Sequence, residues 1–257
     1  MIYEGITMEY FLYTKGTMPK GFGFSHFDMT HLAWLLFAMV VVICSCYHYK
    51  RLSMVGRSRW KKCIAIRLIA DELFKQACLI IGGRFTLGYL PLHLCNINII
   101  LIAVHAFKPS KTIGNFLYTV CLPGTVAALL FPNWTKMLVM NFLHLHSFTL
   151  HILLAVYPAV LTFCGEIKPR VKDIPRCLGL LLSMAAVIYV INVLLDENFF
   201  YLMEAPKGNP LYWFQQHWGD HRLAFPVLIG AVVAVMYIPI ELWEAMHRNE
   251  KRIPKTS

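Results

Sequence analysis

The sequence is dominated by apolar runs of about 20 residues that are almost free of charge. Only 15% of the 257 residues are charged, 58% are hydrophobic, and the mean hydropathy is +0.55. A helix needs about 20 apolar residues to cross a hydrocarbon layer about 30 Å thick. A soluble domain, by contrast, usually carries about 25% charged residues. The sequence therefore predicts an all-α, polytopic membrane protein.

Seven segments are long and apolar enough to be read as spans, so we expect a bundle of about seven transmembrane helices. A single integral membrane domain, 1–257, would then consist of an extracytoplasmic segment, the bundle and a basic tail, at 1–30, 31–244 and 245–257. The expected spans are residues 31–48, 63–83, 89–107, 113–131, 143–163, 177–196 and 224–244.

The basic residues predict the orientation of these spans. Six Lys and Arg residues lie at 49–62, two at 108–111, four at 166–176 and four after 245, which makes 16 on one side against 6 on the other. Positively charged loops stay in the cytoplasm. We therefore expect an extracytoplasmic N-terminus and a cytoplasmic C-terminus, in a multi-pass protein of the cell membrane. Because the net charge of +10 is explained by orientation, the expected partners are membrane lipids and not nucleic acid.

The longest expected connection between spans is residues 197–223. It is rich in Trp, Tyr and Phe, which favour the interface between membrane and water. We expect this segment to lie as a lid over the outer ends of the helices.

Polar residues gather at the outer end of the third expected span, in LPLHLCNI at 90–97. Polar side chains inside a bilayer are costly and indicate function by default. On a regular helix His93 and Asn96 are about 60° apart, whereas Cys95 is about 160° from His93. The spacing predicts a His/Asn face, which Cys95 joins only if Pro91 makes the first turn irregular.

Two further spans present polar faces at a similar depth. In the fifth span, His144 and His151 are seven residues apart and share a face, with Ser147 between them. The sixth span ends with another polar face, formed by Tyr189, Asn192 and Asp196. Three coincident polar faces on the outer half predict a functional site.

The second expected span carries the most charge. Arg67, Asp71 and Lys75 are spaced four residues apart and stack on one face of a helix. This spacing is explained either by a ladder of ion pairs that neutralises itself, or by Asp71 or Glu72 orienting a histidine or carrying a proton.

These side chains suit acyl transfer or ester hydrolysis. A neutral imidazole accepts protons, amides polarise a carbonyl and a thiol is a nucleophile. We expect His151 to be the general base, Cys95 the nucleophile, and His93 and Asn96 the groups that position or polarise the ester. Asn192 would support the histidine, and the expected substrate-binding residues are His144, Ser147, Tyr189 and Asp196.

Metal binding is an alternative role for the histidines. His93, His144 and His151 are suitable ligands for zinc or haem iron. The sequence, however, contains no HExxH pattern and few carboxylates near these residues. We therefore expect no metal and no other cofactor.

The sequence resembles the YwaF-like family of bacterial multi-pass membrane proteins. The resemblance lies in LPLHLCNI at 90–97, in the histidine-rich segment that ends H-ILLAVYP at 151–158, and in N-VLLDEN-FFYL at 192–202. Phe199 departs from the pattern, because the family has a tyrosine there.

The resemblance implies a relationship to a eukaryotic transmembrane acyltransferase that moves fatty acyl chains between phospholipids, and more remotely to the androgen-induced family of lipid hydrolases. Such relatives use a nucleophile with a histidine. The histidine of the acyltransferase matches His151, judging from Tyr157 and Pro158. Its cysteine falls in the segment that matches LPLHLC, and the register there stays open.

Our sequence hypothesis is a membrane-embedded acyltransferase or ester hydrolase that acts on phospholipid acyl chains near the outer leaflet. The alternative is a lipid-binding or transport protein without catalysis. A transporter is less well supported, because the sequence shows no inverted repeat or paired broken helices. A receptor or assembly scaffold also stays open.

The orientation is testable with a reporter fused after Ser257. We expect the reporter to lie in the cytoplasm, because 16 of the 22 basic residues in the connections and tails fall on that side. A protease-protection assay on sealed vesicles provides the measurement, and an external reporter would contradict the orientation.

Overall fold

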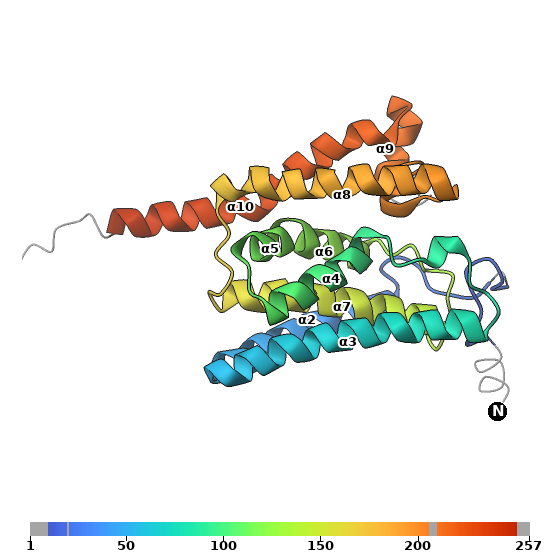
Figure 1. Cartoon of the computed structure of the whole chain (residues 1–257), viewed down its shortest axis with the longest axis horizontal. Helices are drawn as coiled ribbons and strands as arrows, with labels where there is room; N and C mark the ends of the chain where they lie inside the picture. Colours follow the sequence, from blue (N-terminus) through green and yellow to red (C-terminus); the bar gives the residue numbers. More distant parts are fainter. Residues whose placement is uncertain (1–9, 20, 206–209, 251–257) are drawn as a thin grey trace, which may run out of the picture.

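The computed structural model describes residues 10–19, 21–205 and 210–250, and within these ranges it contains helices and no β-strand. Figure 1 shows long helices that lie side by side along one direction. The long helices are α2 (Met29–Arg51), α3 (Met54–Ile81), α4 (Leu94–Phe107), α7 (Phe142–Phe163), α8 (Ile174–Leu195) and α10 (Ala224–Glu250). The shorter ones are η1 (Leu87–Tyr89), α5 (Lys111–Phe116), η2 (Leu117–Cys121), α6 (Leu122–Leu130), η3 (Val171–Asp173), η4 (Phe199–Tyr201), α9 (Pro210–Trp218) and η5 (His221–Leu223).

Six helical segments of the described chain are long and apolar enough to cross a membrane. They correspond to every expected span except the second, and the protein is therefore a helical, multi-pass membrane protein. The second expected span is α3, which has sufficient length but carries Arg67, Asp71, Glu72 and Lys75 within its apolar stretch. Its crossing of the membrane, and with it the count of seven, stays a prediction.

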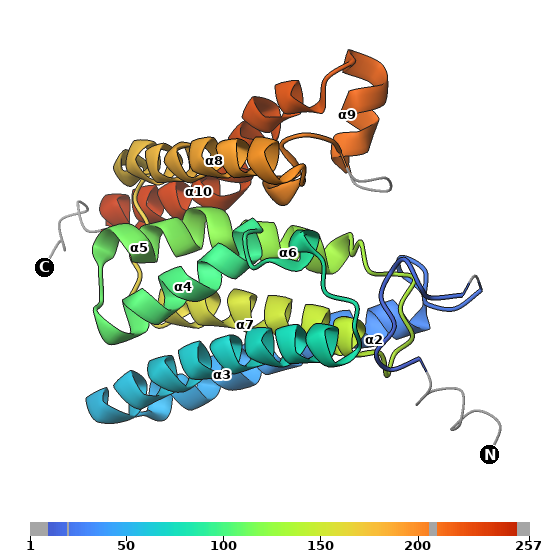
Figure 2. The same cartoon turned by 45° about the vertical axis from the view of Figure 1, so that its right-hand side comes forward.

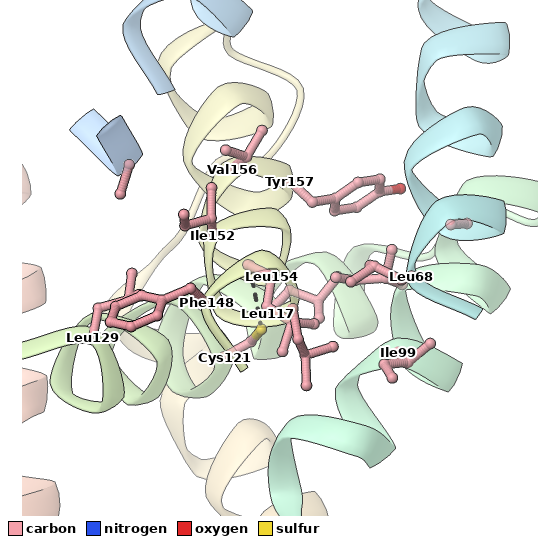
Figure 3. Close-up of a cluster of buried hydrophobic side chains, with 14 of the residues drawn as sticks. Leu68, Ile99, Leu117, Cys121, Leu129, Phe148, Ile152, Leu154, Val156 and Tyr157 are labelled. Atoms are coloured by element: carbon pink, nitrogen blue, oxygen red, sulfur yellow. Dashed lines mark hydrogen bonds between the residues drawn. The ribbon is translucent and has the colours of Figure 1, made fainter. Parts of the chain in front are cut away.

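Helix α7 forms the centre of the bundle. It contacts α2, α3 and α6, and most of its side chains are buried. Figure 3 shows the apolar cluster around it, to which α3 contributes Leu68, α4 contributes Ile99 and α6 contributes Leu129. The apolar residues of α7 surround the helix on all sides, as a helix buried on every face requires.

The expected basic loop 49–62 is mostly helical, which corrects its boundaries. Only Leu52 and Ser53 separate α2 from α3, and the Ser53 side chain caps α3 by accepting a hydrogen bond from the Gly56 N–H. Residues 54–62 continue as helix because Met, Arg and Lys are good helix formers and Ser is a preferred N-cap. Helix α10 likewise extends to Glu250, beyond the expected end of its span at 244; residues 251–257 of the expected tail lie outside the described chain.

Glu166 joins the α2–α3 hairpin to the segment after α7. Its carboxylate accepts hydrogen bonds from the Tyr49 hydroxyl at 2.7 Å and the Lys61 ammonium at 2.9 Å, and Arg57 lies 3.6 Å away. Desolvation raises the pKa of Glu166, but these hydrogen bonds outweigh it and hold the pKa below its ordinary value. The network fixes the end of the bundle opposite α9.

Helix α4 is shorter than the expected span 89–107. It begins at Leu94, with His93 as its N-cap in an extended conformation, and residues 82–93 are non-helical apart from η1. Its 14 residues are about 21 Å long, against about 33 Å for the 22 residues of α7. The chain therefore descends beside α3 before α4 begins (Figure 2).

This short helix sets the depth of its first turn. Helices α4 and α7 run in the same direction and end at the same end of the bundle (Figures 1 and 2). Cys95 lies twelve residues before Phe107, and His151 lies twelve residues before Phe163. At 1.5 Å per residue, Cys95 and His151 are at the same depth, well inside the bundle.

The expected span 113–131 is formed by three consecutive helical pieces, α5, η2 and α6. The middle piece is a π-helix, and Pro123 follows it at the start of α6. Proline lacks the N–H that an α-helix requires, and π-segments of this kind are frequent near functional sites. Cys121, at the end of η2, donates its S–H to the Leu154 carbonyl of α7 across 3.6 Å (Figure 3).

The end of the bundle that carries α9, here called the α9 end, is covered by the segment before α2. The Asn141 amide donates to the carbonyls of Tyr10, Phe11 and Tyr13 at 2.9–3.0 Å. The buried His31 donates from Nε2 to the Leu129 carbonyl at 2.7 Å. Backbone carbonyls of the segment before α2 and of the last turn of α6 therefore have side-chain partners, as buried carbonyls require.

Helices α8 and α10 lie on one side of the bundle (Figure 1). Few of their described apolar side chains are buried, and the rest are exposed or half-buried, as helices in contact with lipid require. The connection 197–223 forms η4, α9 and η5 at the α9 end, with residues 206–209 outside the described chain. Its role as a lid stays a prediction; among its described elements, η4 contacts His93 at the site described below.

Candidate functional site

Three neighbouring side chains at the start of α4 point toward three different elements. His93 contacts Phe199 and Tyr201 of η4, with ring centroids 5.3 and 5.4 Å apart. Cys95 reaches α7 and Asn96 reaches α3. The expected angle of 160° between His93 and Cys95 does not apply, because His93 precedes the helix.

Cys95 and His151 are in direct contact, with Cys95 Sγ lying 3.2 Å from His151 Nε2. The other ring nitrogen, Nδ1, lies 2.7 Å from the Ser147 carbonyl oxygen. A carbonyl oxygen only accepts, so Nδ1 carries the hydrogen and Nε2 of the neutral ring is free to accept the thiol proton. The indole of Trp134 stacks on the imidazole at 5.0 Å and 19°. The ring is held in one tautomer and one orientation.

The first turn of α4 offers hydrogen-bond donors beside the thiol. The N-cap His93 makes no side-chain hydrogen bond to the helix, and the first N–H groups of an α-helix have no partner within it. Cys95 is the second residue of this turn, so its sulfur lies at the positive end of the α4 dipole. Anions are stabilised at such a position.

A buried polar cluster surrounds Glu72 of α3. The Asn96 amide donates to Glu72 Oε2 at 2.8 Å, and Lys75 Nζ lies 2.7 Å from Oε1. Asp71 pairs with His146 of α7 at 2.8 Å. Arg67 is exposed, so the ladder predicted from the four-residue spacing gives way to pairs between helices and to the pair of Lys75 with Glu72.

Asn192 fixes the turn that carries the contacts of His93. Its amide donates to the Phe199 carbonyl at 2.9 Å, and its oxygen accepts the Phe199 N–H at 2.8 Å. Phe200 and Tyr201 have φ angles of 60° and 55°, a strained region for non-glycine residues. Asn192 therefore supports His93 through η4, since both hydrogen bonds of its side chain go to Phe199.

The hydroxyl of Tyr201 stays protonated near the thiol. Burial and, to a smaller extent, the nearby Cys95 raise the pKa of Tyr201 to about 12, although the hydrogen bond from Asn133 opposes the rise. Its backbone carbonyl accepts a hydrogen bond from His221 at 2.7 Å. Tyr201 is thus a neutral hydrogen-bonding group between η4 and the start of α4.

The remaining predicted site residues lie elsewhere. His144 is buried against Phe24, Trp34 and Phe148, so it faces α2 and the segment before it. It shares a face with His151, but seven residues along a helix separate them by about 10 Å in depth. Tyr189 and Asp196 are exposed, and Ser147 contributes its carbonyl.

Trp134 and Tyr201 were not singled out by the sequence. Trp134 belongs to FPNWTK at 131–136, a break between two apolar runs, and tryptophan is common at such breaks. Tyr201 lies in the aromatic connection that follows the sixth span. Neither position has a periodicity that links it to Cys95, because both are reached through non-helical segments.

The histidines were the expected ligands in the metal-binding alternative. Within the described ranges, no group of three or more His, Cys, Asp or Glu side chains is arranged to hold a metal ion. His93, His144 and His151 point to different surroundings, as described above. The geometry that is present is that of a thiol, an imidazole and backbone donors.

The fold and this site define a class: a multi-pass helical membrane protein with a cysteine and a histidine in contact inside the bundle. Residues 21–237 match the TMEM164 family. The chain belongs to the TMEM164 family, a family of transmembrane proteins. No curated protein and no solved structure gives a significant match to it. The YwaF-like resemblance stays a prediction.

The two hydrogen bonds by which Asn192 holds η4 are testable with Asn192→Ala. The change leaves the buried N–H of Phe199 without a partner and its carbonyl with only the 3.4 Å hydrogen bond from the Leu202 N–H, and an unpaired buried group costs about 1–3 kcal/mol. We expect a loss of about 2 kcal/mol or more in stability, and faster labelling of Cys95 by a water-soluble thiol reagent as η4 loosens. Thermal unfolding in detergent and peptide mass mapping provide the measurements.

Asn198→Ala is the matched control, because Asn198 bonds the exposed backbone of Met203 and Glu204 in the same connection. It should leave Cys95 labelling unchanged. Equal labelling in wild type and Asn192→Ala would show that η4 does not cover the thiol.

Proposed function

We propose that the protein transfers acyl chains between membrane lipids through a thioester on Cys95. The observation that carries this proposal is the 3.2 Å contact between Cys95 Sγ and His151 Nε2, inside a helical membrane bundle. A nucleophile within hydrogen-bond reach of a base, with the base oriented by a third group, is the arrangement of covalent catalysis. Here the third group is the Ser147 carbonyl.

The first half-reaction forms the thioester. The Cys95 thiol gives its proton to His151 Nε2, and the sulfur attacks the carbonyl carbon of a lipid ester. The oxyanion that forms lies at the first turn of α4, where free N–H groups stabilise it. The bond to the glycerol oxygen then breaks, and His151 returns the proton to that oxygen. The products are acyl-Cys95 and a lysolipid.

The second half-reaction releases the acyl chain. His151 accepts the proton of an acceptor hydroxyl, whose oxygen attacks the thioester carbon, and the Cys95 sulfur leaves and regains the proton. A lysolipid hydroxyl gives acyl transfer, whereas water gives hydrolysis. The depth of Cys95 inside the bundle favours a lipid acceptor, because a dry site limits attack by water.

Lipid binding without catalysis is the second candidate. An apolar groove of about 380 Å³ lies between the segment where η3 leads into α8 and the middle of α10. Its lining includes Ile174, Val233, Tyr237 and Leu242, and it fits a hydrocarbon chain. This groove supports binding of a lipid tail, whether or not Cys95 reacts.

The thioester is testable with a phospholipid that carries a clickable acyl chain. After incubation with purified protein, we expect an adduct on the peptide that contains Cys95, and hydroxylamine should release it. Cys95→Ala should abolish both the adduct and acyl turnover. His151→Ala should slow adduct formation by about 10²–10⁴-fold, the usual contribution of a general base.

Cys121→Ala is the matched control, because Cys121 is a second buried thiol, bonded to the Leu154 carbonyl. It should keep the adduct and the turnover. Full turnover in a folded Cys95→Ala variant would refute the thioester. Lipid binding without turnover in every variant would favour the second candidate.

A further inference from the structure

Glu72 is a buried carboxylate of α3 to which the thioester chemistry assigns no role. Only 8% of its surface is exposed. Its Oε1 forms an ion pair with Lys75 Nζ at 2.7 Å and accepts a hydrogen bond from Gln76 Nε2 at 2.7 Å. Its Oε2 accepts the Asn96 amide at 2.8 Å. A single side chain therefore joins α3 to the turn of α4 that carries Cys95.

The same network also holds the chain before that turn. Gln76 Nε2, bonded to Glu72, donates as well to the Tyr89 carbonyl at 2.9 Å. Tyr89 belongs to η1, in the segment that descends to α4. The residues on both sides of His93 and Leu94 are thus attached to one turn of α3.

The third connection of Glu72 is to the helix of the base. His146 of α7 lies 3.7 Å from Glu72 Oε2 through its Nε2 and 2.8 Å from Asp71 through its Nδ1. His146 precedes His151 by five residues on the same helix. The carboxylates of α3 therefore contact both helices whose separation decides the distance from Cys95 to His151.

We propose that Glu72 is a positioning residue for acyl transfer, which holds Cys95 Sγ at His151 Nε2 by fixing the first turn of α4 against α3 and α7. The proposal rests on the thioester function of Cys95. Glu72 touches neither the thiol nor the imidazole, so it acts through Asn96, Gln76 and His146. A catalytic pair needs such support, because a displacement of about 1 Å costs about 10²-fold in rate.

Stability alone does not account for a charge at this place. Burying a carboxylate and an ammonium is expensive, and apolar replacements of buried ion pairs are often neutral or stabilising. Glu72 instead fixes the orientation of its neighbours, since the two oxygens of a carboxylate accept several directional hydrogen bonds at once. An apolar side chain fills the space but accepts none.

The test compares Glu72→Leu, Glu72→Gln and Asn96→Ala in the full-length protein in detergent with phospholipid. We expect Glu72→Leu and Asn96→Ala to lower kcat by about 10²-fold with KM changed much less. Glu72→Gln should keep part of the rate, because its amide oxygen still accepts a hydrogen bond. Arg67→Gln, on the exposed face of α3, is the control and should match the wild type.

A double-mutant cycle separates positioning from a general loss of structure. The rate at which N-ethylmaleimide alkylates Cys95 should fall when His151→Ala is introduced into the wild type. In the Glu72→Leu background, the same His151 change should have little effect, because the two side chains no longer meet. If Glu72→Leu disrupted the fold only elsewhere, the alkylation rate of Cys95 would still fall when His151→Ala is added.

A swap of hydrogen-bonding groups provides the rescue. Glu72→Gln with Asn96→Asp reverses donor and acceptor but restores the bond between α3 and α4, so its kcat should exceed that of Asn96→Asp alone. If Glu72→Leu does not purify as a folded protein, Asn96→Ala and the double variant test the proposal in its place. Asn96→Ala removes one hydrogen bond of Glu72 and keeps its contacts with Lys75 and Gln76.

Two results overturn the proposal. Folded Glu72→Leu or Asn96→Ala with wild-type kcat and an unchanged dependence of alkylation on His151 would show that Glu72 does not position Cys95. A swap no better than Asn96→Asp alone would do the same. Full turnover in Cys95→Ala would instead refute the thioester function itself, so the two failures are distinguishable.

Discussion

The structure depends on one constraint: the chain enters the bundle as non-helical backbone before α4 begins. Backbone N–H and C=O groups inside an apolar layer must be hydrogen bonded, and irregular backbone is tolerated there only when the protein itself supplies partners. Gln76 supplies one to the Tyr89 carbonyl. The descent shortens α4 to 14 residues, so that the positive end of a helix, with Cys95 in its first turn, lies at the depth of His151.

The costly polar residues of α3 follow from the same constraint. In a helix that faced only lipid and apolar neighbours, the polar side chains of Asp71, Glu72, Lys75 and Gln76 would lack partners and would be destabilising. Each of these side chains is paired, with α4, with α7 or with another residue of α3. Buried polar side chains that find partners on neighbouring helices hold those helices in a defined arrangement. The cluster therefore buries polar side chains where apolar ones would pack, and in return it fixes the position of the first turn of α4.

Much of the architecture was predictable, because membrane spans are recognised by length and apolarity. Six of the seven expected segments are confirmed as helices long and apolar enough to cross a membrane. The start of α4 was not predictable, since residues 90–96 join an apolar run that reads as a span whether or not they are helical. The helical wheel separated Cys95 from His93 because it assumed a helix that begins before residue 93. The pairing of Cys95 with His151 became visible only once the true start of α4 was known. The role of Asn192 at Phe199 also depends on a turn with positive φ, which no periodicity reveals.

The most direct test of the account measures which residue of α7 faces Cys95. His151→Cys and His144→Cys share a face of α7 but differ in depth by about 10 Å. Each variant is treated with a short bifunctional thiol reagent, and the linked peptides are identified by mass spectrometry. The account predicts a link from Cys95 to position 151 and none to position 144. A preferred link to position 144 would contradict it.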